Sequence, residues 1–187
     1  MKQFKLAYVL AIALFLAAGV LPAQAHDFTW MGTLAIGETE SKDHEDQAPW
    51  AGWVNVEVTN TGTEAWGDFH FEIYEVSGYG AVDNVHWLDT TNGGSNPTSS
   101  QTLDGWSINN SVVGATIDLF FYGDPVGPGE DAHFHVYNEN SDELAFFGTS
   151  FHPTPVPLPG AALLYISGCG LFGWVAGKKH FRKKLKS

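Results

Sequence analysis

The sequence predicts an all-β protein whose central domain, residues 26–153, is a single antiparallel β-sandwich. Apolar and polar residues alternate with a period of two along this region, as expected for half-buried strands. Each alternating run is bounded by Gly, Pro, Asn or Asp, which are typical turn residues. No stretch within the region shows a helical period, so we expect about seven or eight strands and no helix.

The expected strands share this alternation, and several are rich in Val, Ile, Phe and Trp. In chain order they cover residues 28–37, 51–60, 66–76, 82–88, 111–123, 131–138 and 143–151. The connecting segments are an acidic loop (38–49), a turn (60–65), a polar loop (89–105) and a tight turn (124–130). The acidic loop lacks the regular Asp spacing of a calcium-binding loop, so we expect it to be solvated, with Ca²⁺ binding as the alternative.

Two of the expected strands, "DFHFEIY" and "DAHFHVY", share one pattern. Period two places Phe69, Phe71 and Ile73 of the first strand in the core, and Ala132, Phe134 and Val136 of the second. The opposite face then carries the polar side chains Asp68, His70, Glu72, Tyr74, Asp131, His133, His135 and Tyr137. If the strands were neighbours, Asp68, His70, Asp131, His133 and His135 would converge into a site for Cu or Zn. The alternative is that these residues are the solvated half of two alternating strands.

His26 would be the first residue of the mature chain if the signal is cleaved after Ala25. An N-terminal His chelates Cu(II) through its amine and imidazole together, which resembles half of the histidine brace of lytic polysaccharide monooxygenases. Asp131 and His133 are the candidates for the second half.

The charge distribution excludes nucleic acid as a partner. All 21 acidic residues lie between Asp27 and Glu143, whereas eight of the nine basic residues lie in the first five or last ten positions. Only Lys42 remains in the exported part, so one positive charge stands against 21 negative charges and the net charge there is −20. Binding to phosphates needs Lys and Arg, which this region lacks.

The two ends have the pattern of targeting segments. Residues 1–25 contain two lysines, an apolar stretch and a final "AQA", which predicts a signal peptide that forms a helix. Residues 154–187 contain "TPVPLPG", an apolar run over 161–176 that predicts a membrane helix, and a basic tail over 178–186. We expect the tail to stay cytoplasmic by the positive-inside rule. Its residues beside the membrane are Lys178, Lys179, Arg182, Lys183 and Lys184. The one cysteine, Cys169, lies in the apolar run, so the exported domain has no disulfide.

The order of these C-terminal parts resembles the PEP-CTERM sorting signal of Gram-negative bacteria. The matching motif is Val156, Pro157, Leu158, Pro159, in which Leu158 replaces the glutamate of that signal. The resemblance implies handling by an exosortase and attachment, at least transiently, to the membrane in the cell envelope. It also implies exopolysaccharide as a partner.

Within the domain, "VNVEVTNTGTEAW" and "VGPGEDAHFHVY" resemble segments of bacterial immunoglobulin-like domains. That resemblance implies a structural or adhesive module, not an enzyme, with no required cofactor. Catalytic motifs such as Gly-x-Ser-x-Gly and His-Glu-x-x-His are absent from the sequence. Metal binding and carbohydrate binding through exposed tryptophans remain the alternatives.

Overall fold

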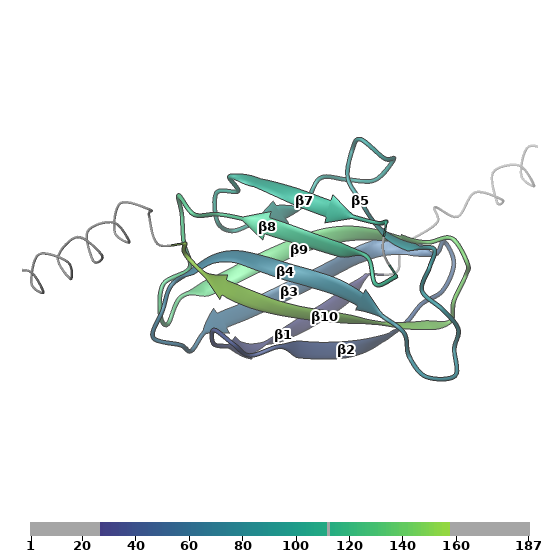
Figure 1. Ribbon diagram of the computed structural model, residues 1–187, viewed down its shortest axis with the longest axis horizontal. Coiled ribbons are helices and arrows are strands. Elements are labelled where there is room, and N and C mark those ends of the chain that lie inside the picture. The colour runs from purple at the N-terminus through teal and green to yellow at the C-terminus, as the bar shows by residue number, and fades with distance from the viewer. Residues whose placement is uncertain (1–26, 112, 158–187) are drawn as a thin grey trace, which may run out of the picture.

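A computed structural model describes residues 27–111 and 113–157, and this part of the chain contains ten strands and no helix (Figure 1). The strands are β1 (Phe28–Leu34), β2 (Glu40–Glu45), β3 (Ala51–Asn60), β4 (Trp66–Tyr74), β5 (Val85–Leu88), β6 (Thr98–Ser99), β7 (Gly105–Asn109), β8 (Thr116–Phe120), β9 (Asp131–Asn140) and β10 (Phe146–Pro155). The expected helices at both ends lie outside the described residues. Within these residues, no helix is long and apolar enough to cross a membrane.

The strands form two five-stranded sheets. In the first, which we call sheet A, the order is β1-β3-β9-β5, and β6 also pairs with β9. In the second, sheet B, the order is β2-β10-β4-β8-β7. All pairs are antiparallel except β1 with β3, which is parallel. The prediction of a β-sandwich is therefore confirmed, whereas the prediction that it is antiparallel throughout was wrong for the β1–β3 pair.

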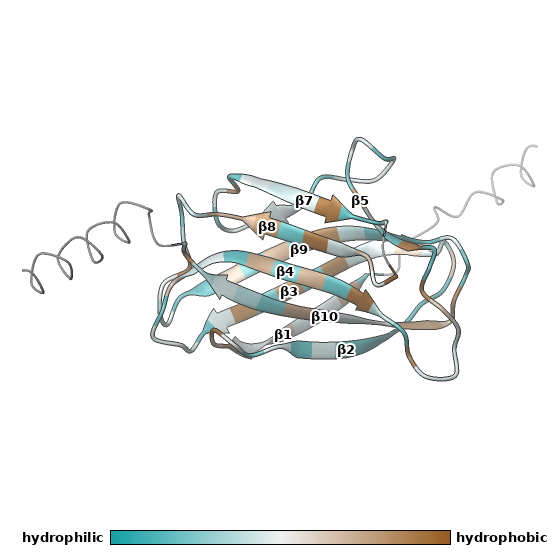
Figure 2. Cartoon of the chain, in the orientation of Figure 1, coloured by the Kyte–Doolittle hydropathy of each residue, from teal (hydrophilic) through white to brown (hydrophobic). Residues whose placement is uncertain are grey.

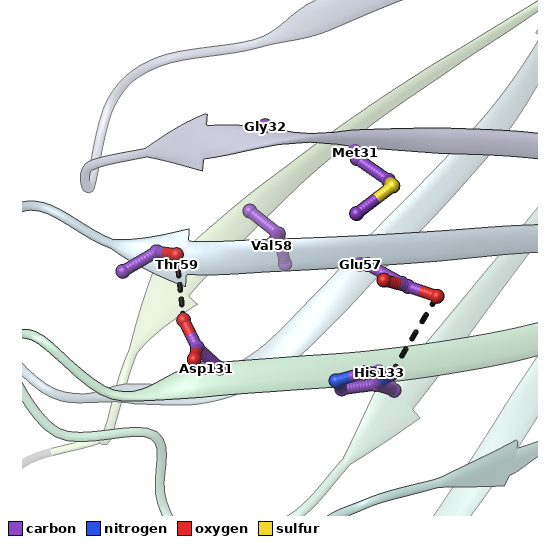
Figure 3. Close-up of a pocket in the computed structure, with 7 residues that line it drawn as sticks. All are labelled: Met31, Gly32, Glu57, Val58, Thr59, Asp131 and His133. Carbon is purple, nitrogen blue, oxygen red and sulfur yellow. Dashed lines mark hydrogen bonds and ion pairs between the residues drawn. The ribbon is translucent and has the colours of Figure 1, made fainter.

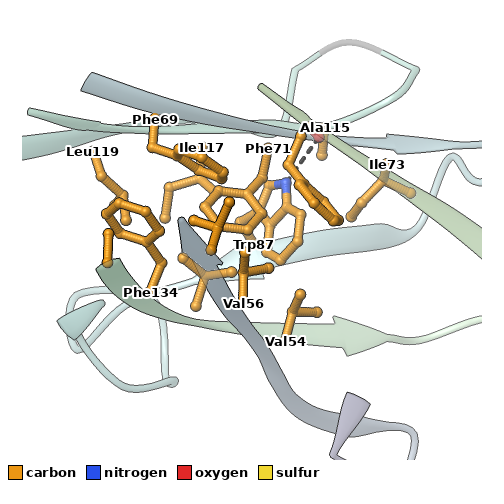
Figure 4. Close-up of a cluster of buried hydrophobic side chains, with 14 of the residues drawn as sticks. Val54, Val56, Phe69, Phe71, Ile73, Trp87, Ala115, Ile117, Leu119 and Phe134 are labelled. Atoms are coloured by element: carbon orange, nitrogen blue, oxygen red, sulfur yellow. Dashed lines mark hydrogen bonds between the residues drawn. The ribbon is translucent and has the colours of Figure 1, made fainter. Parts of the chain in front are cut away.

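The core lies between the sheets and follows the predicted alternation. Figure 4 shows Phe69, Phe71 and Ile73 of β4 facing Val54 and Val56 of β3. Phe134 of β9 fills the same layer, and the Trp87 indole donates a hydrogen bond to the Ala115 carbonyl at 2.9 Å. All six residues predicted to point inward from the two related strands are buried: Phe69, Phe71, Ile73, Ala132, Phe134 and Val136. Hydropathy along β4 and β8 alternates in the same way (Figure 2).

The acidic segment at 38–49, expected to be a loop, contains strand β2, so that prediction was wrong. β2 is one of the two outer strands of sheet B, and among the described residues it pairs only with β10. An edge strand needs few apolar residues, and charged side chains on it discourage pairing with other chains. In β2 only His44 is buried, and four of its other residues are charged. The strand therefore could not be recognised from the pattern of hydrophobic residues.

Strands β6 and β7 were also missed by the sequence analysis. β6 is a two-residue pairing inside the expected polar loop. β7 is a short edge strand beside β8, with the sequence Gly-Trp-Ser-Ile-Asn. Neither strand is long enough to produce a clear alternation.

The last strand extends beyond the expected domain boundary at residue 153. β10 continues to Pro155, where the register with β4 shifts, and Pro155 pairs with Trp66. The Val156 backbone N–H then donates to the Ala65 carbonyl at 3.3 Å. The sandwich therefore includes the first residue of the expected sorting motif.

Candidate functional site

The two Asp-x-His strands are not neighbours. β4 lies in sheet B and β9 in sheet A, so their outward faces are on opposite sides of the sandwich. Asp68 and His70 therefore lie on one surface, whereas Asp131, His133 and His135 lie on the other. The structure does not bring the five residues together, and His26 lies outside the described residues.

On sheet A, the β3–β9 register determines the surroundings of the second group. His133 stands opposite Glu57, and Asp131 stands opposite Thr59. The His133 Nδ1 lies 4.0 Å from Glu57 Oε1, and the Thr59 hydroxyl donates to Asp131 Oδ1 at 2.6 Å. The His133 side chain is 48% exposed, so its approach to Glu57 is a solvated surface contact.

These residues line a groove of about 250 Å³ across three strands. Figure 3 shows Met31 of β1, Glu57 of β3 and His133 of β9 side by side, with Thr59 and Asp131 further along the same strands. His135 is two residues along β9, opposite Asn55 and Thr98, and is also exposed. The groove thus combines carboxylates, an imidazole and a thioether on an open face.

The outer face of sheet B holds a more closely connected network around His70. Its Nδ1 lies 2.6 Å from Asp118 Oδ1, and its Nε2 lies 3.2 Å from Asp68 Oδ1. Both ring nitrogens can donate only when the imidazole is protonated. The hydrogen bond to Asp68 raises the pKa of His70, burial opposes that change, and the bond to Asp118 raises the pKa further. The arrangement therefore favours an imidazolium between two carboxylates.

Asp68 is the buried centre of this network. Its carboxylate accepts hydrogen bonds from His70, from the Thr154 hydroxyl and, at 3.1 Å, from the Tyr122 hydroxyl. Burial raises the pKa of Asp68, but the hydrogen bonds from His70 and Thr154 outweigh it, so the pKa is lowered overall. Asp68 therefore stays ionised although it is buried, because several donors compensate its charge.

A second histidine lies against the first. His152 of β10 stands opposite His70 of β4, and the two rings stack with centroids 4.9 Å apart and an interplanar angle of 20°. Burial lowers the pKa of His152, and the positive charge of His70 lowers it further. The pair therefore favours one charged and one neutral ring.

The alternating pattern predicted Asp68 and His70 as site residues, but it did not single out Asp118, His152, Thr154 or Tyr122. Asp118 and His152 each occupy an outward position of an alternating strand, as His70 does. Alternation alone would have placed them on a polar face. Their proximity depends on β4 lying between β10 and β8, and that strand order has no local signature.

The geometry gives limited support for a metal site. Among residues 27–111 and 113–157, no three His, Cys, Asp or Glu side chains are placed so that they could hold a metal ion together. In the network on sheet B, both nitrogens of His70 already face carboxylates. Asp27, the first described residue, accepts a hydrogen bond at 3.1 Å from the backbone of Trp53. Trp53 is four residues along β3 from Glu57, the residue opposite His133. The distance between these two positions of the strand is roughly 13 Å.

The tryptophans of the described region are mostly engaged within the protein. Trp66 and Trp87 are in the core, and Trp30 packs against Phe151 with ring centroids 4.9 Å apart. Trp53 contacts Tyr137 edge to face at 5.2 Å, and the Trp106 indole donates to Asp89 at 3.1 Å. The flat row of exposed rings that stacks on sugars is not formed by these five residues.

Of the expected sorting motif, Val156 and Pro157 belong to the described residues. Leu158, Pro159 and the basic residues Lys178, Lys179, Arg182, Lys183 and Lys184 lie outside them. Comparison of the chain with known protein families, with curated proteins and with solved structures gave no match.

Proposed function

We propose that this chain is an exported structural or adhesive protein of the Gram-negative cell envelope or exopolysaccharide matrix. Its β-sandwich would be of the immunoglobulin-like type, and residues 154–187 would be handled by an exosortase-type enzyme. The observation that carries the proposal is the direct passage of β10 into the motif Val156, Pro157, Leu158, Pro159. The folded domain and the expected sorting signal are joined without a linker.

The position of β10 supports an anchoring role. β10 is an inner strand of sheet B, with β2 paired to it over Phe146–Phe151 and β4 over Gly148–Pro155. A force applied to the C-terminal end would therefore act along two antiparallel ladders and would have to shear both. A domain attached to a surface benefits from this arrangement, because its tethered strand is held on both sides.

The surface charge supports a solvated, exported location. With Lys42 the only basic residue in the exported region, the field around the sandwich is negative, and this keeps the domain soluble. Lys42 itself is paired with Glu40 at 2.6 Å.

The proposal is tested by following display of the full chain in a Gram-negative host that contains an exosortase. Pro157→Ala together with Pro159→Ala should abolish removal of the C-terminal segment and surface exposure, read by mass and by protease treatment of intact cells. The matched control is Pro125→Ala with Pro128→Ala, two exposed prolines in the β8–β9 turn, which should be displayed normally. Equal display and processing of the motif variant would overturn the proposal.

Metal binding at the outer face of sheet A is a second candidate function. The supporting observation is that His133 and His135 are both exposed and two residues apart on one strand face. Two imidazoles at this spacing can clamp Zn²⁺ or Cu²⁺.

A further inference from the structure

β1 is an outer strand that presents an unguarded edge. Within the described part of the chain it pairs on one side with β3, and no strand pairs with its other side. No charged residue lies between Asp27 and Glu38, so the whole of β1 is uncharged. Natural edge strands usually carry charge, Pro or a bulge, because unpaired backbone groups invite pairing with another chain.

The other outer strands of the described sandwich are charged or are shorter than β1. β2, at the adjoining edge of sheet B, carries Glu40, Lys42, Asp43 and Glu45. On the opposite side, the Asn110 side chain links the two sheets. It accepts a hydrogen bond from the Trp87 backbone N–H at 3.1 Å and donates one to the Trp87 carbonyl at 2.8 Å. These bonds join the end of β7 to β5. Within the described residues, β1 is the only outer strand that is both long and free of charged residues and of such hydrogen bonds.

The sequence of β1 is complementary to itself about its centre. If two copies pair antiparallel about Met31, Met31 faces Met31 of the second copy and Thr29 faces Thr33. On the other face, Phe28 meets Leu34 and Trp30 meets Gly32. Thr–Thr and apolar pairs stabilise antiparallel neighbours, and a two-fold interface requires this kind of self-complementarity. This register also pairs even-numbered residues with even-numbered ones and odd-numbered residues with odd-numbered ones. The backbone N–H and C=O groups on the free edge of one β1 strand therefore lie opposite those of the other.

Met31 is the natural centre of such a contact. It is 69% exposed, more than any other large hydrophobic residue among those described. Figure 3 shows it on the open face of sheet A, beside Glu57 and Val58. In the paired form it would be covered by the same residue of the second copy, and Trp30 would remain packed on Phe151 inside each copy.

We propose that β1 is a self-association edge, which pairs antiparallel with β1 of a second copy about Met31 and joins two sheets A into one continuous sheet. A contact of seven residues per copy falls in the small, transient class of interfaces. Confinement to a surface raises the effective concentration and makes such a weak contact effective.

The acidic residues of β2 lie next to this edge, since the rings of Phe28 in β1 and His44 in β2 are in contact, with centroids 5.4 Å apart. Association should therefore strengthen as ionic strength rises.

Cysteine cross-linking of the full chain in membranes tests both the association and its register. In a Cys169→Ser background, Met31→Cys should give roughly ten-fold more covalent dimer with diamide than Thr33→Cys, because a disulfide needs Cα atoms within about 7 Å. Thr33 is also exposed on the same face, but Thr33 of one copy would lie roughly 13 Å from Thr33 of the other. Thr29→Cys and Thr33→Cys chains should each remain monomeric alone and cross-link when expressed together.

A charge placed at the centre supplies the second test. Met31→Lys puts like charges opposite each other and should reduce the cross-link between Thr29→Cys and Thr33→Cys chains to the level of either chain alone. Equal cross-linking of Met31→Cys and Thr33→Cys would show random collision and overturn the proposal. Absence of a cross-link from Met31→Cys, in a chain that keeps wild-type protease resistance, would overturn it as well. Thr29, Met31 and Thr33 are all exposed, so these substitutions leave the core intact.

Discussion

The rings of Phe69 and Phe134 stack with centroids 4.4 Å apart and an interplanar angle of 21°. Each residue is next to the histidine of an Asp-x-His-Phe segment: Phe69 precedes His70 in β4, and Phe134 follows His133 in β9. The two related segments therefore meet through their phenylalanines across the core, and their histidines point away from each other. The resemblance between the segments reflects two inward faces of one sandwich, not two halves of one site.

Truncation of Phe134 should destabilise the domain strongly. Phe134 is fully buried and contacts Phe121 as well as Phe69, so Phe134→Ala removes apolar burial and leaves a cavity. We expect a loss of about 3–5 kcal/mol in the free energy of unfolding, measured by urea denaturation. His133→Ala is the matched control on the same strand and should change that free energy by less than about 0.5 kcal/mol. A harmless Phe134→Ala would contradict the described register.

The histidine pair on sheet B should give a characteristic pH dependence of stability. The pKa of His70 is raised above the unfolded value of 6.5, so its stabilising contribution is fully present below that pH. The contribution is lost as the pH rises through the folded pKa. The pKa of His152 is lowered, so its contribution is present above pH 6.5 and is lost as the pH falls through the folded pKa.

Single substitutions separate these opposing effects. Melting temperatures measured from about pH 5 to about pH 9 should fall less steeply at the alkaline end for His70→Gln than for the wild type. For His152→Gln, the decline at the acidic end should be smaller. His86→Gln, at the β5–β9 pair on the other sheet, is the control and should follow the wild-type curve. Identical profiles for all four proteins would show that neither ring is coupled to the fold.

The alternation of residues was enough to predict the fold class and the buried faces of β4 and β9. It was not enough for β2 and β7, because an edge strand has one paired neighbour and tolerates polar residues on both faces. The network around His70 required the order β10-β4-β8, which is set by long-range packing. The sequence therefore predicted which residues are outward but not which outward residues meet.

Zinc titration tests the second candidate function. We expect Zn²⁺ to bind weakly to the wild-type protein through His133 and His135, and to give no heat with the double variant His133→Ala/His135→Ala in isothermal calorimetry. Because Asp68 and His70 are on the opposite face, His70→Gln should bind Zn²⁺ as the wild type does. Loss of binding in His70→Gln, or the absence of heat with the wild-type protein, would remove the sheet A histidines as a metal site.

Added salt should stabilise the domain. The net charge of −20 over residues 26–153 produces self-repulsion, and counter-ions screen it over a Debye length of about 10 Å at 0.1 M salt. We expect the melting temperature to rise as NaCl increases. CaCl₂ at equal ionic strength should give a similar rise, because the acidic segment lacks the spacing of a calcium loop. A melting temperature that does not respond to NaCl would show that the acidic residues are too dispersed to repel one another.

The last residues of β10 should determine the C-terminal boundary of the stable domain. A chain ending at Pro153 lacks the Thr154 hydroxyl that donates to Asp68, the pairing of Pro155 with Trp66 and the bond from Val156 to Ala65. A chain ending at Pro157 keeps all three contacts. Removing a donor from a buried carboxylate costs about 1–3 kcal/mol, so we expect the shorter chain to unfold at a lower urea concentration. Circular dichroism should show strand structure for the chain ending at Pro157, and a random-coil spectrum for it would mean that residues 158–187 are needed for folding. Equal midpoints for the two chains would show instead that the strand beyond Pro153 contributes nothing to stability.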